Sequence, residues 1–212
     1  VFIDKPIVGN LRDIHRLLDL SNKHPDVPIM GGSSVRFCQE VEALKAQKDE
    51  LGFISAAFVS GPNDFFSYGI HTVELFQGFF GAGVKCVSYL GENEGELFQA
   101  TYKDGTIVIY QLHSPSHQWF FSLTSSKGAR SFTVDNSKIY DSLIAKFHEM
   151  LTTGKAPLPL TEFLEAVKIQ LAAKEARQTG KTIYLEDLGY DEGFDGKAYT
   201  EQYRMNKWKG KY

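Results

Sequence analysis

The sequence predicts an α+β fold of two layers: an open, mainly antiparallel sheet with helices on one face, preceded by a short βαβ unit. The beginning of the chain alternates strand, helix and strand over about 30 residues, and a unit of this kind makes its two strands parallel. The middle of the chain contains six strand candidates, five of them consecutive with short connections, and this arrangement predicts an antiparallel meander.

The βαβ unit is expected in residues 1–34. Residues 1–3 are apolar without alternation, which is typical of a buried parallel strand. Asn10 is a suitable N-cap for a helix that should end near His24, ahead of a proline. A second strand is expected at residues 27–30. Because a buried parallel strand needs neighbours on both sides and the sequence opens on a valine rather than a methionine, we expect a piece of a longer protein.

The main domain is expected in residues 35–185. Asp104 and Gly105 form its clearest hairpin turn, because these residues tolerate the positive φ values of a tight turn. Helices are expected at 36–48, 140–153 and 161–179. The strand candidates lie at 53–60, 84–90, 96–102, 106–112, 119–124 and 129–134.

The last part of the chain, residues 186–212, is expected to be a tail. Its aromatic residues are separated by charges and glycines without a sustained period. The tail either lies over its own domain or docks as an arm on a neighbouring subunit, since exposed aromatic side chains favour interfaces. These aromatic residues are Tyr190, Phe194, Tyr199, Tyr203, Trp208 and Tyr212.

The composition argues against several classes of function. The chain has 212 residues, of which 42% are hydrophobic and 23% are charged, as in ordinary globular proteins. A net charge of -3 gives no reason to expect nucleic acid or an anionic membrane as a partner, and no apolar run approaches the roughly 18 residues of a membrane helix. Cys38 and Cys86 make neither a disulfide framework nor a metal cluster, so a cytoplasmic location is expected.

Residues 63–81 contain the strongest candidate for a functional site. A histidine with a hydroxyl one turn before it and a carboxylate one turn after it can accept a proton from a bound alcohol near neutral pH. The alternative is that His71 is a surface or core residue without such a role. The helical spacing places Phe66, Ile70, Val73 and Phe80 toward the sheet, and Asp64, Ser67, His71, Glu74 and Gly78 on the other side.

A second histidine pair lies in the segment between two strand candidates. His113 and His117 have the spacing that suits metal binding on a helix, but Pro115 between them favours a loop. No third ligand is visible, so we expect no metal site. As a loop at the edge of the sheet, this segment can still contact a substrate.

Several motifs, in order along residues 1–185, resemble those of the glucose-fructose oxidoreductase, inositol dehydrogenase and rhizopine-catabolism (Gfo/Idh/MocA) family. Lys5 and Pro6 match the family's Glu-Lys-Pro segment, and residues 69–71, followed by Glu74, match its Gly-Ile-His block. The remaining motifs are the Arg-Phe pair in residues 32–37, the hairpin at 102–105, the Lys-Gly pair at 127–128, and residues 153–157 with the helix that carries residues 164–165.

The resemblance implies an NAD(P)-dependent oxidoreductase that acts on sugars or polyols. In the family a Rossmann-type dinucleotide-binding domain precedes an α/β domain that shapes the substrate site and mediates oligomerisation. Residues 1–34 resemble the end of the first domain, and residues 35–185 resemble the second. By the same resemblance Lys5 lies between nicotinamide and substrate, Lys5 and Pro6 contact the NAD or NADP cofactor, and His71 relays the proton of the reacting hydroxyl.

Four further residues are candidates for substrate binding. Ser67 and Glu74 flank His71 on the same side of the predicted helix. Tyr68 either lines a sugar pocket or packs against its own domain. Arg36 is either a solvated cation at the start of a helix or a contact across the cleft between the two domains.

The sequence departs from the family at two points. Ser67 stands where the family often has Asp, and because a serine cannot stabilise an imidazolium by charge, the pKa of His71 should be lower than with Asp. Glu74 or Asp64 can replace that carboxylate if their side chains reach the imidazole. The Gly-x-Gly-x-x-Gly turn that binds a pyrophosphate is absent from the sequence, so this chain should not bind NAD(P) tightly by itself.

Two functions follow from these observations. The first is the C-terminal, substrate-binding part of an NAD(P)-dependent sugar or polyol oxidoreductase, which forms a homodimer or homotetramer through the open face of its sheet. The second is a non-catalytic relative that binds a sugar-like ligand or serves as an oligomeric scaffold.

Overall fold

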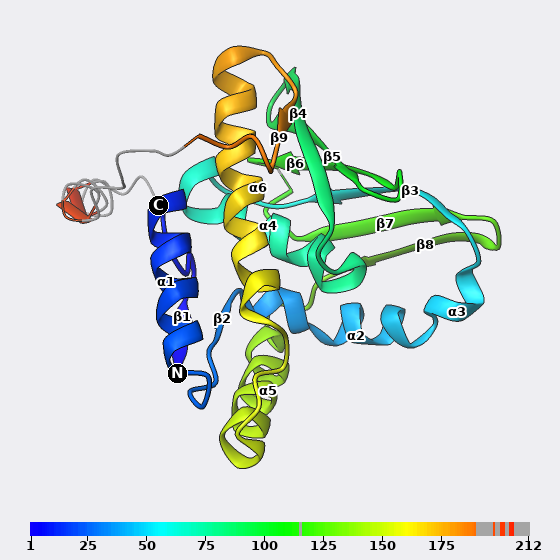
Figure 1. Cartoon of the computed structure of the whole chain (residues 1–212). Helices are drawn as coiled ribbons and strands as arrows, with labels where there is room; N and C mark the ends of the chain where they lie inside the picture. The colour runs from blue at the N-terminus through cyan, green and yellow to red at the C-terminus, as the bar shows by residue number, and fades with distance from the viewer. Residues whose placement is uncertain (115, 190–196, 198–199, 202–203, 206–212) are drawn as a thin grey trace.

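The chain forms two sheets of different size, joined by helices (Figure 1). This structure, a computed structural model, describes residues 1–114, 116–189, 197, 200–201 and 204–205. All six aromatic residues of the expected tail lie outside the described residues, and with them both interpretations of the tail. None of the described helices has the length and apolar character needed to cross a bilayer.

The small sheet confirms the predicted βαβ unit. Strands β1 (Phe2–Asp4) and β2 (Met30–Gly32) are parallel and are connected by helix α1 (Leu11–Lys23). The side chain of Asn10 caps α1 by accepting a hydrogen bond of 2.8 Å from the backbone N–H of Asp13. Strand β2 begins later than expected, because Pro28 has no N–H to donate to a strand partner and Met30 pairs with Phe2.

In the part of the chain that the structure describes, the large sheet has seven strands in the order β8-β7-β3-β6-β5-β4-β9, and among them only the β3–β6 pair is parallel. This confirms the mainly antiparallel sheet and all six strand candidates. Strand β9 was not predicted, because two residues are too short to show a pattern. The strands are β3 (Ile54–Ser60), β4 (Val84–Glu92), β5 (Glu96–Tyr102), β6 (Ile107–Leu112), β7 (Phe120–Ser125), β8 (Gly128–Thr133) and β9 (Ile183–Tyr184).

The prediction that five consecutive strands form one continuous meander is wrong at a single position. Strand β3 lies between β6 and β7, so the segment that connects β6 to β7 crosses the end of β3. The alternation of apolar residues predicts which side of a strand faces the core, but it does not predict which strand pairs with each edge.

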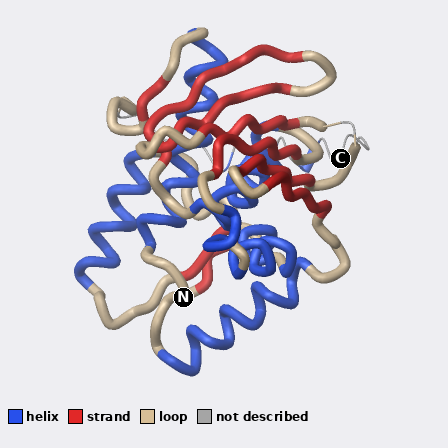
Figure 2. The backbone as a smooth tube through the Cα atoms, turned by 90° about the vertical axis from the view of Figure 1, so that its right-hand side faces the viewer, coloured by secondary structure: helices blue, strands red, loops and turns tan. Residues whose placement is uncertain are grey.

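The helices cover one face of the large sheet (Figures 1 and 2), as predicted. Helix α4 (Phe65–Phe80) packs on β3 and β6, and helix α6 (Leu160–Thr179) packs on β4 and on α4. Helix α5 (Ile139–Thr153) packs on the 3-10 helix η1 (Ser34–Phe37).

The single helix expected at 36–48 is divided into three pieces. The 3-10 helix η1 is followed by α2 (Gln39–Ala46) and α3 (Lys48–Leu51). The break between η1 and α2 occurs at Cys38, whose ψ of 152° is extended rather than helical. Arg36 therefore lies on a short turn that packs on α4, and not on the longer helix.

Aromatic side chains form the core between the sheet and α4. Phe98 and Tyr110 stack with ring centroids 5.3 Å apart, and Phe76 of α4 lies 5.4 Å from Tyr110. Phe79 of the same helix contacts Phe121 of β7 at 5.6 Å. These contacts fix which side of α4 faces the sheet.

The opposite face of the large sheet is not covered by described helices (Figure 2). Its side chains alternate with the buried residues along β3, β5, β6 and β7, and they are half-buried. They are Ala56, Phe58, Leu97, Gln99, Ile107, Ile109, Gln111, Phe120 and Ser122.

Candidate functional site

Helix α4 is fixed at both ends by local interactions. The side chain of Asp64 caps its N-terminus by accepting a hydrogen bond of 2.8 Å from the backbone N–H of Ser67. Gly81 ends the helix with a φ of 78°, which a residue with a Cβ rarely adopts.

The side of α4 that was predicted to be polar is buried against the segment that follows β2. A Cβ on Gly78 would lie only 2.4 Å from the backbone oxygen of Arg36, so glycine permits this close approach. Phe66, which was predicted to face the sheet, is instead 43% exposed. Helical spacing identified the apolar residues, but the tertiary structure buries the polar side of the helix as well.

His71 lies in a site with a hydroxyl on one side and aromatic rings around it. Its Nδ1 lies 2.6 Å from the Oγ of Ser33, in the loop after β2. The rings of Tyr68 and Trp119 lie 5.3 Å and 5.6 Å from the imidazole, and these two rings stack on each other at 6.5 Å. Neither Asp64 nor Glu74 hydrogen-bonds His71 in the described structure, so Ser33 takes the place of the expected carboxylate partner.

Ser33 and Trp119 were not predicted as members of this site. The only signal for Ser33 in the sequence is its position directly after a glycine pair at the end of a predicted parallel strand, where such sheets bind ligands. The sequence contains no signal for Trp119. This residue comes close to His71 only because the segment between β6 and β7 crosses the end of β3.

Lys5 reaches the same site from the carboxyl end of β1. Its ammonium donates a hydrogen bond of 3.0 Å to the backbone oxygen of Ser67 and lies 5.2 Å from the ring centroid of Tyr68. Burial lowers the pKa of Lys5, while the charges of Asp4 and Asp64 act in the opposite direction. The structure therefore brings Lys5, Ser67, Tyr68 and His71 together, although β1 and α4 are far apart in the sequence.

The environment keeps the imidazole of His71 neutral. Burial, and then the positive charge of Lys5, lower the pKa of His71 from 6.5 to about 3. Ser67 is not among the causes of this shift, so the effect expected from Ser67 in place of Asp stays a prediction.

Arg36 and Glu74 form a buried ion pair and are not brought to His71. The Nε of Arg36 donates to a carboxylate oxygen of Glu74, and both side chains are 1% exposed. The Nη2 of Arg36 also donates a hydrogen bond of 2.8 Å to Gln77. Burial raises the pKa of Glu74, and the Arg36 guanidinium opposes this shift. The interpretation of Arg36 as a solvated cation is wrong, and the two charges that were considered for substrate binding neutralise each other.

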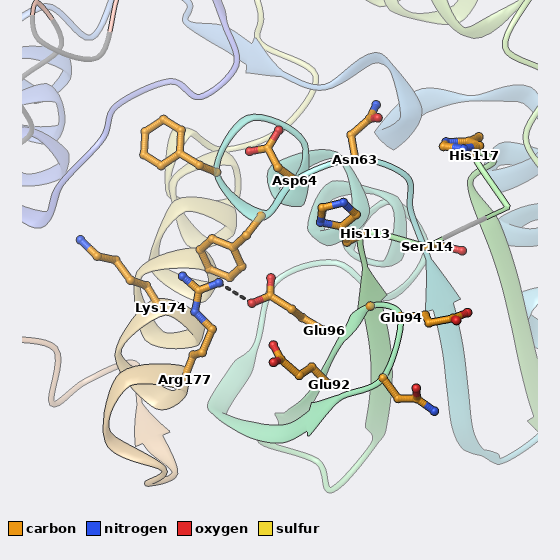
Figure 3. A pocket seen from close by; sticks show the side chains of 14 residues that line it. Asn63, Asp64, Glu92, Glu94, Glu96, His113, Ser114, His117, Lys174 and Arg177 are labelled. Atoms are coloured by element: carbon orange, nitrogen blue, oxygen red, sulfur yellow. Dashed lines mark hydrogen bonds and ion pairs between the residues drawn. The ribbon is translucent and has the colours of Figure 1, made fainter. Parts of the chain in front are cut away.

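A groove of about 960 Å³ opens at the N-terminal end of α4 (Figure 3). Arg177 and Lys174 of α6 line one side, and Arg177 forms an ion pair with Glu96 of β5. His113 and His117 also line the groove. Their φ values of 62° and 53° are not helical, in agreement with the predicted loop.

The groove is separate from the contacts around His71. Lys5 and His71 do not line it, but Asp64, whose charge acts on Lys5, does. No three His, Cys, Asp or Glu residues of the described chain gather as metal ligands would.

Comparison with solved structures identifies the fold. A probable dehydrogenase from Thermotoga maritima superimposes with a TM-score of 0.75 at 17% identity, over 89% of this chain and 74% of that chain. Scyllo-inositol dehydrogenase from Lactobacillus casei, solved with NAD(H) and scyllo-inositol, gives a TM-score of 0.75 at 15% identity, over 88% of this chain and 73% of that chain.

Myo-inositol dehydrogenase from Lactobacillus casei, solved with NAD(H) and myo-inositol, gives a TM-score of 0.71 at 16% identity, over 90% of this chain and 72% of that chain. No family model matches the chain, and no curated protein matches its sequence. The chain therefore shares the fold of these dehydrogenases.

Removing Arg36 should leave the Glu74 carboxylate buried without its cation. We expect Arg36→Met to lower the free energy of unfolding by about 3–5 kcal/mol, measured by urea denaturation. The double variant Arg36→Met, Glu74→Leu removes both charges and should recover most of that loss. A single variant that is as stable as the double variant would contradict a buried pair.

The low pKa of His71 should make the folded chain less stable in mild acid. Below about pH 6.5 His71 takes up a proton in the unfolded chain, where its pKa is near 6.5, but stays neutral in the folded chain. The free energy of unfolding therefore decreases as the pH falls through 6.5. We expect a loss of about 2 kcal/mol between about pH 7 and pH 5, from urea denaturation at each pH.

His71→Asn should abolish this part of the pH dependence. His148→Asn, which changes an exposed histidine of α5, should retain it. Parallel curves for the wild type and His71→Asn between these pH values would show that His71 does not carry the effect.

Proposed function

We propose that this chain is the substrate-binding part of an NAD(P)-dependent oxidoreductase of the Gfo/Idh/MocA type. It would transfer hydride between a sugar or polyol alcohol and nicotinamide. The observation that supports this most strongly is the convergence of Lys5 and His71 from separate segments onto one half-buried site beside Tyr68. The shared fold with inositol dehydrogenases supports the same reaction class.

Two basic groups at one substrate oxygen can divide the work of the reaction. One hydrogen-bonds the oxygen and stabilises the negative charge that develops on it, and the other exchanges its proton. Half-buried Tyr68 offers apolar ring surface to the carbon skeleton of a sugar or polyol, and buried Trp119 stacks on it, while Ser67 lies beside Lys5. Arg36 and Glu74 are left out of the proposed substrate site because each is bound to the other.

The residues present fit only the reacting end of a dinucleotide. Lys5 and Pro6 stand at the carboxyl end of a parallel strand, the edge at which such sheets bind ligands. The glycine fingerprint for a pyrophosphate is not in the sequence. NAD(P), when bound, supplies the chemistry of hydride transfer. We therefore assign residues 1–34 to the end of a Rossmann-type domain and residues 35–185 to the substrate-binding domain, in a cytoplasmic protein.

One observation favours the second candidate, a non-catalytic protein that binds a sugar-like ligand. Ser67 replaces the carboxylate that would stabilise an imidazolium, and His71 resists protonation. The two candidates differ in whether Lys5 and His71 are needed for hydride transfer or only for ligand binding.

Removing either basic group should abolish most of the activity. In the intact protein, supplied with NAD+ or NADP+ and a panel of inositols and sugars, we expect His71→Ala and Lys5→Met each to lower kcat by about 10²-fold or more. Reduced cofactor is followed by its absorbance. His148→Ala and Lys103→Met, which change exposed residues, serve as controls. Activity within a few-fold of wild type in both site variants would contradict the assignment, and polyol binding without any turnover would favour the second candidate.

We also propose that a second copy of the chain covers the open face of the large sheet. The half-buried apolar side chains of this face, among them Phe58 and Ile109, form a patch that is favourable to bury. We expect light scattering to give a dimeric or tetrameric mass for the wild type, and a monomeric mass for Phe58→Lys with Ile109→Lys. Leu151→Lys, at an exposed position of α5, should keep the wild-type mass. A monomeric wild type would overturn this proposal.

A further inference from the structure

The hydroxyl of Ser33 is a buried group whose hydrogen bonds determine what His71 can do. Ser33 is 1% exposed, so water does not replace its partners. Among the described residues its Oγ has two hydrogen-bond partners: the backbone N–H of Val35 at 3.3 Å and the Nδ1 of His71 at 2.6 Å.

These two contacts favour one direction for the hydrogen bond between Ser33 and His71. The N–H of Val35 can only donate, so it occupies one lone pair of the Ser33 oxygen. If the hydroxyl proton points to Nδ1, both donors are satisfied. If Nδ1 carried the proton and donated to Oγ, the hydroxyl proton would be buried with no acceptor, which is unfavourable.

We infer that Ser33 is a positioning residue that holds His71 in the tautomer with an unprotonated Nδ1 and a protonated Nε2. The consequence for the reaction rests on the proposed function. In this tautomer the Nε2–H of His71 donates a hydrogen bond to the substrate oxygen, and His71 does not act as the base. Of the two groups at that oxygen, His71 supplies the hydrogen bond. Lys5, as a neutral amine, takes the hydroxyl proton when the alcohol is oxidised, and its ammonium returns that proton when the carbonyl is reduced; the burial that lowers the pKa of Lys5 favours this exchange.

The surroundings of His71 agree with this tautomer. Among the described residues, no other side chain hydrogen-bonds the ring, so Nε2 is the nitrogen left for a ligand. The positive charge of Lys5 and the burial of the ring both oppose protonation of His71, so a neutral N–H donor is the form that persists. Ser33 itself is fixed as the N-cap of η1, with an extended backbone of φ -91° and ψ 141°.

The tautomer can be measured without any enzymatic assay, by 15N-histidine NMR on the full chain. We expect His71 to show a protonated Nε2 and an unprotonated Nδ1 from about pH 5 to pH 8. In Ser33→Ala the hydroxyl that donates to the unprotonated Nδ1 is lost. The neutral ring is then less stabilised, so the pKa of His71 should rise, and the 15N signals of Nδ1 and Nε2 should differ less because both tautomers are populated. Ser34→Ala changes the neighbouring serine, which is buried but whose side chain makes no hydrogen bond in the described structure, and it should behave as wild type.

Two further results keep this inference distinct from the proposed function. If Ser33→Ala does not fold, Ser33→Cys, which keeps the volume but donates weakly, should give the same change. In the intact protein, Ser33→Ala should lower kcat by roughly 10-fold or more and shift the pH profile, with KM little changed.

A protonated Nδ1 in the wild type, or an unchanged His71 signal in the serine variants, would overturn the inference whatever the activity. The expected tautomer in a protein that transfers no hydride would leave the role of Ser33 intact and reject the proposed function.

Discussion

The buried ion pair between Arg36 and Glu74 fixes how helix α4 meets the segment that follows β2. Each charge would be costly to bury by itself, so the 3-10 helix and α4 are held at one distance and in one register. Gly32 and Gly78 make the approach possible: a Cβ on Gly32 would lie 2.4 Å from the Glu74 carboxylate, and one on Gly78 would meet the backbone of Arg36. The site around His71 follows from this contact.

Ser33 adjoins one of these glycines, and His71 lies about one turn before Glu74 on α4. A shift of the 3-10 helix along α4 would therefore separate the Ser33 hydroxyl from the imidazole. The βαβ unit contributes both Lys5 and Ser33, whereas α4 contributes Ser67, Tyr68 and His71. The site lies at the junction of two structural units, and its geometry is only as rigid as the packing between them.

The electrostatics of the site are those of a positive charge on Lys5, with the carboxylates of Asp4 and Asp64 near it, beside a neutral ring. Lys5 is half-buried and hydrogen-bonded to a backbone oxygen, and its charge opposes a second one on His71. A neutral imidazole next to an ammonium suits an oxygen atom whose charge changes during reaction, because the ring can hydrogen-bond that oxygen without competing for the same proton.

The sequence by itself determined the local structure, and it made His71, and through a family resemblance Lys5, candidates whose roles stay predictions. Periodicity and the cap at Asn10 predicted α1, and alternation predicted six strands of the large sheet, because these signals depend only on neighbouring residues. The tertiary structure alone decided that β3 lies between β6 and β7, that Arg36 is buried against Glu74, and that Ser33 and Trp119 surround His71. A pattern shows which side of an element is apolar, whereas the partner that covers that side, or that pairs with a buried charge, comes from a distant part of the chain.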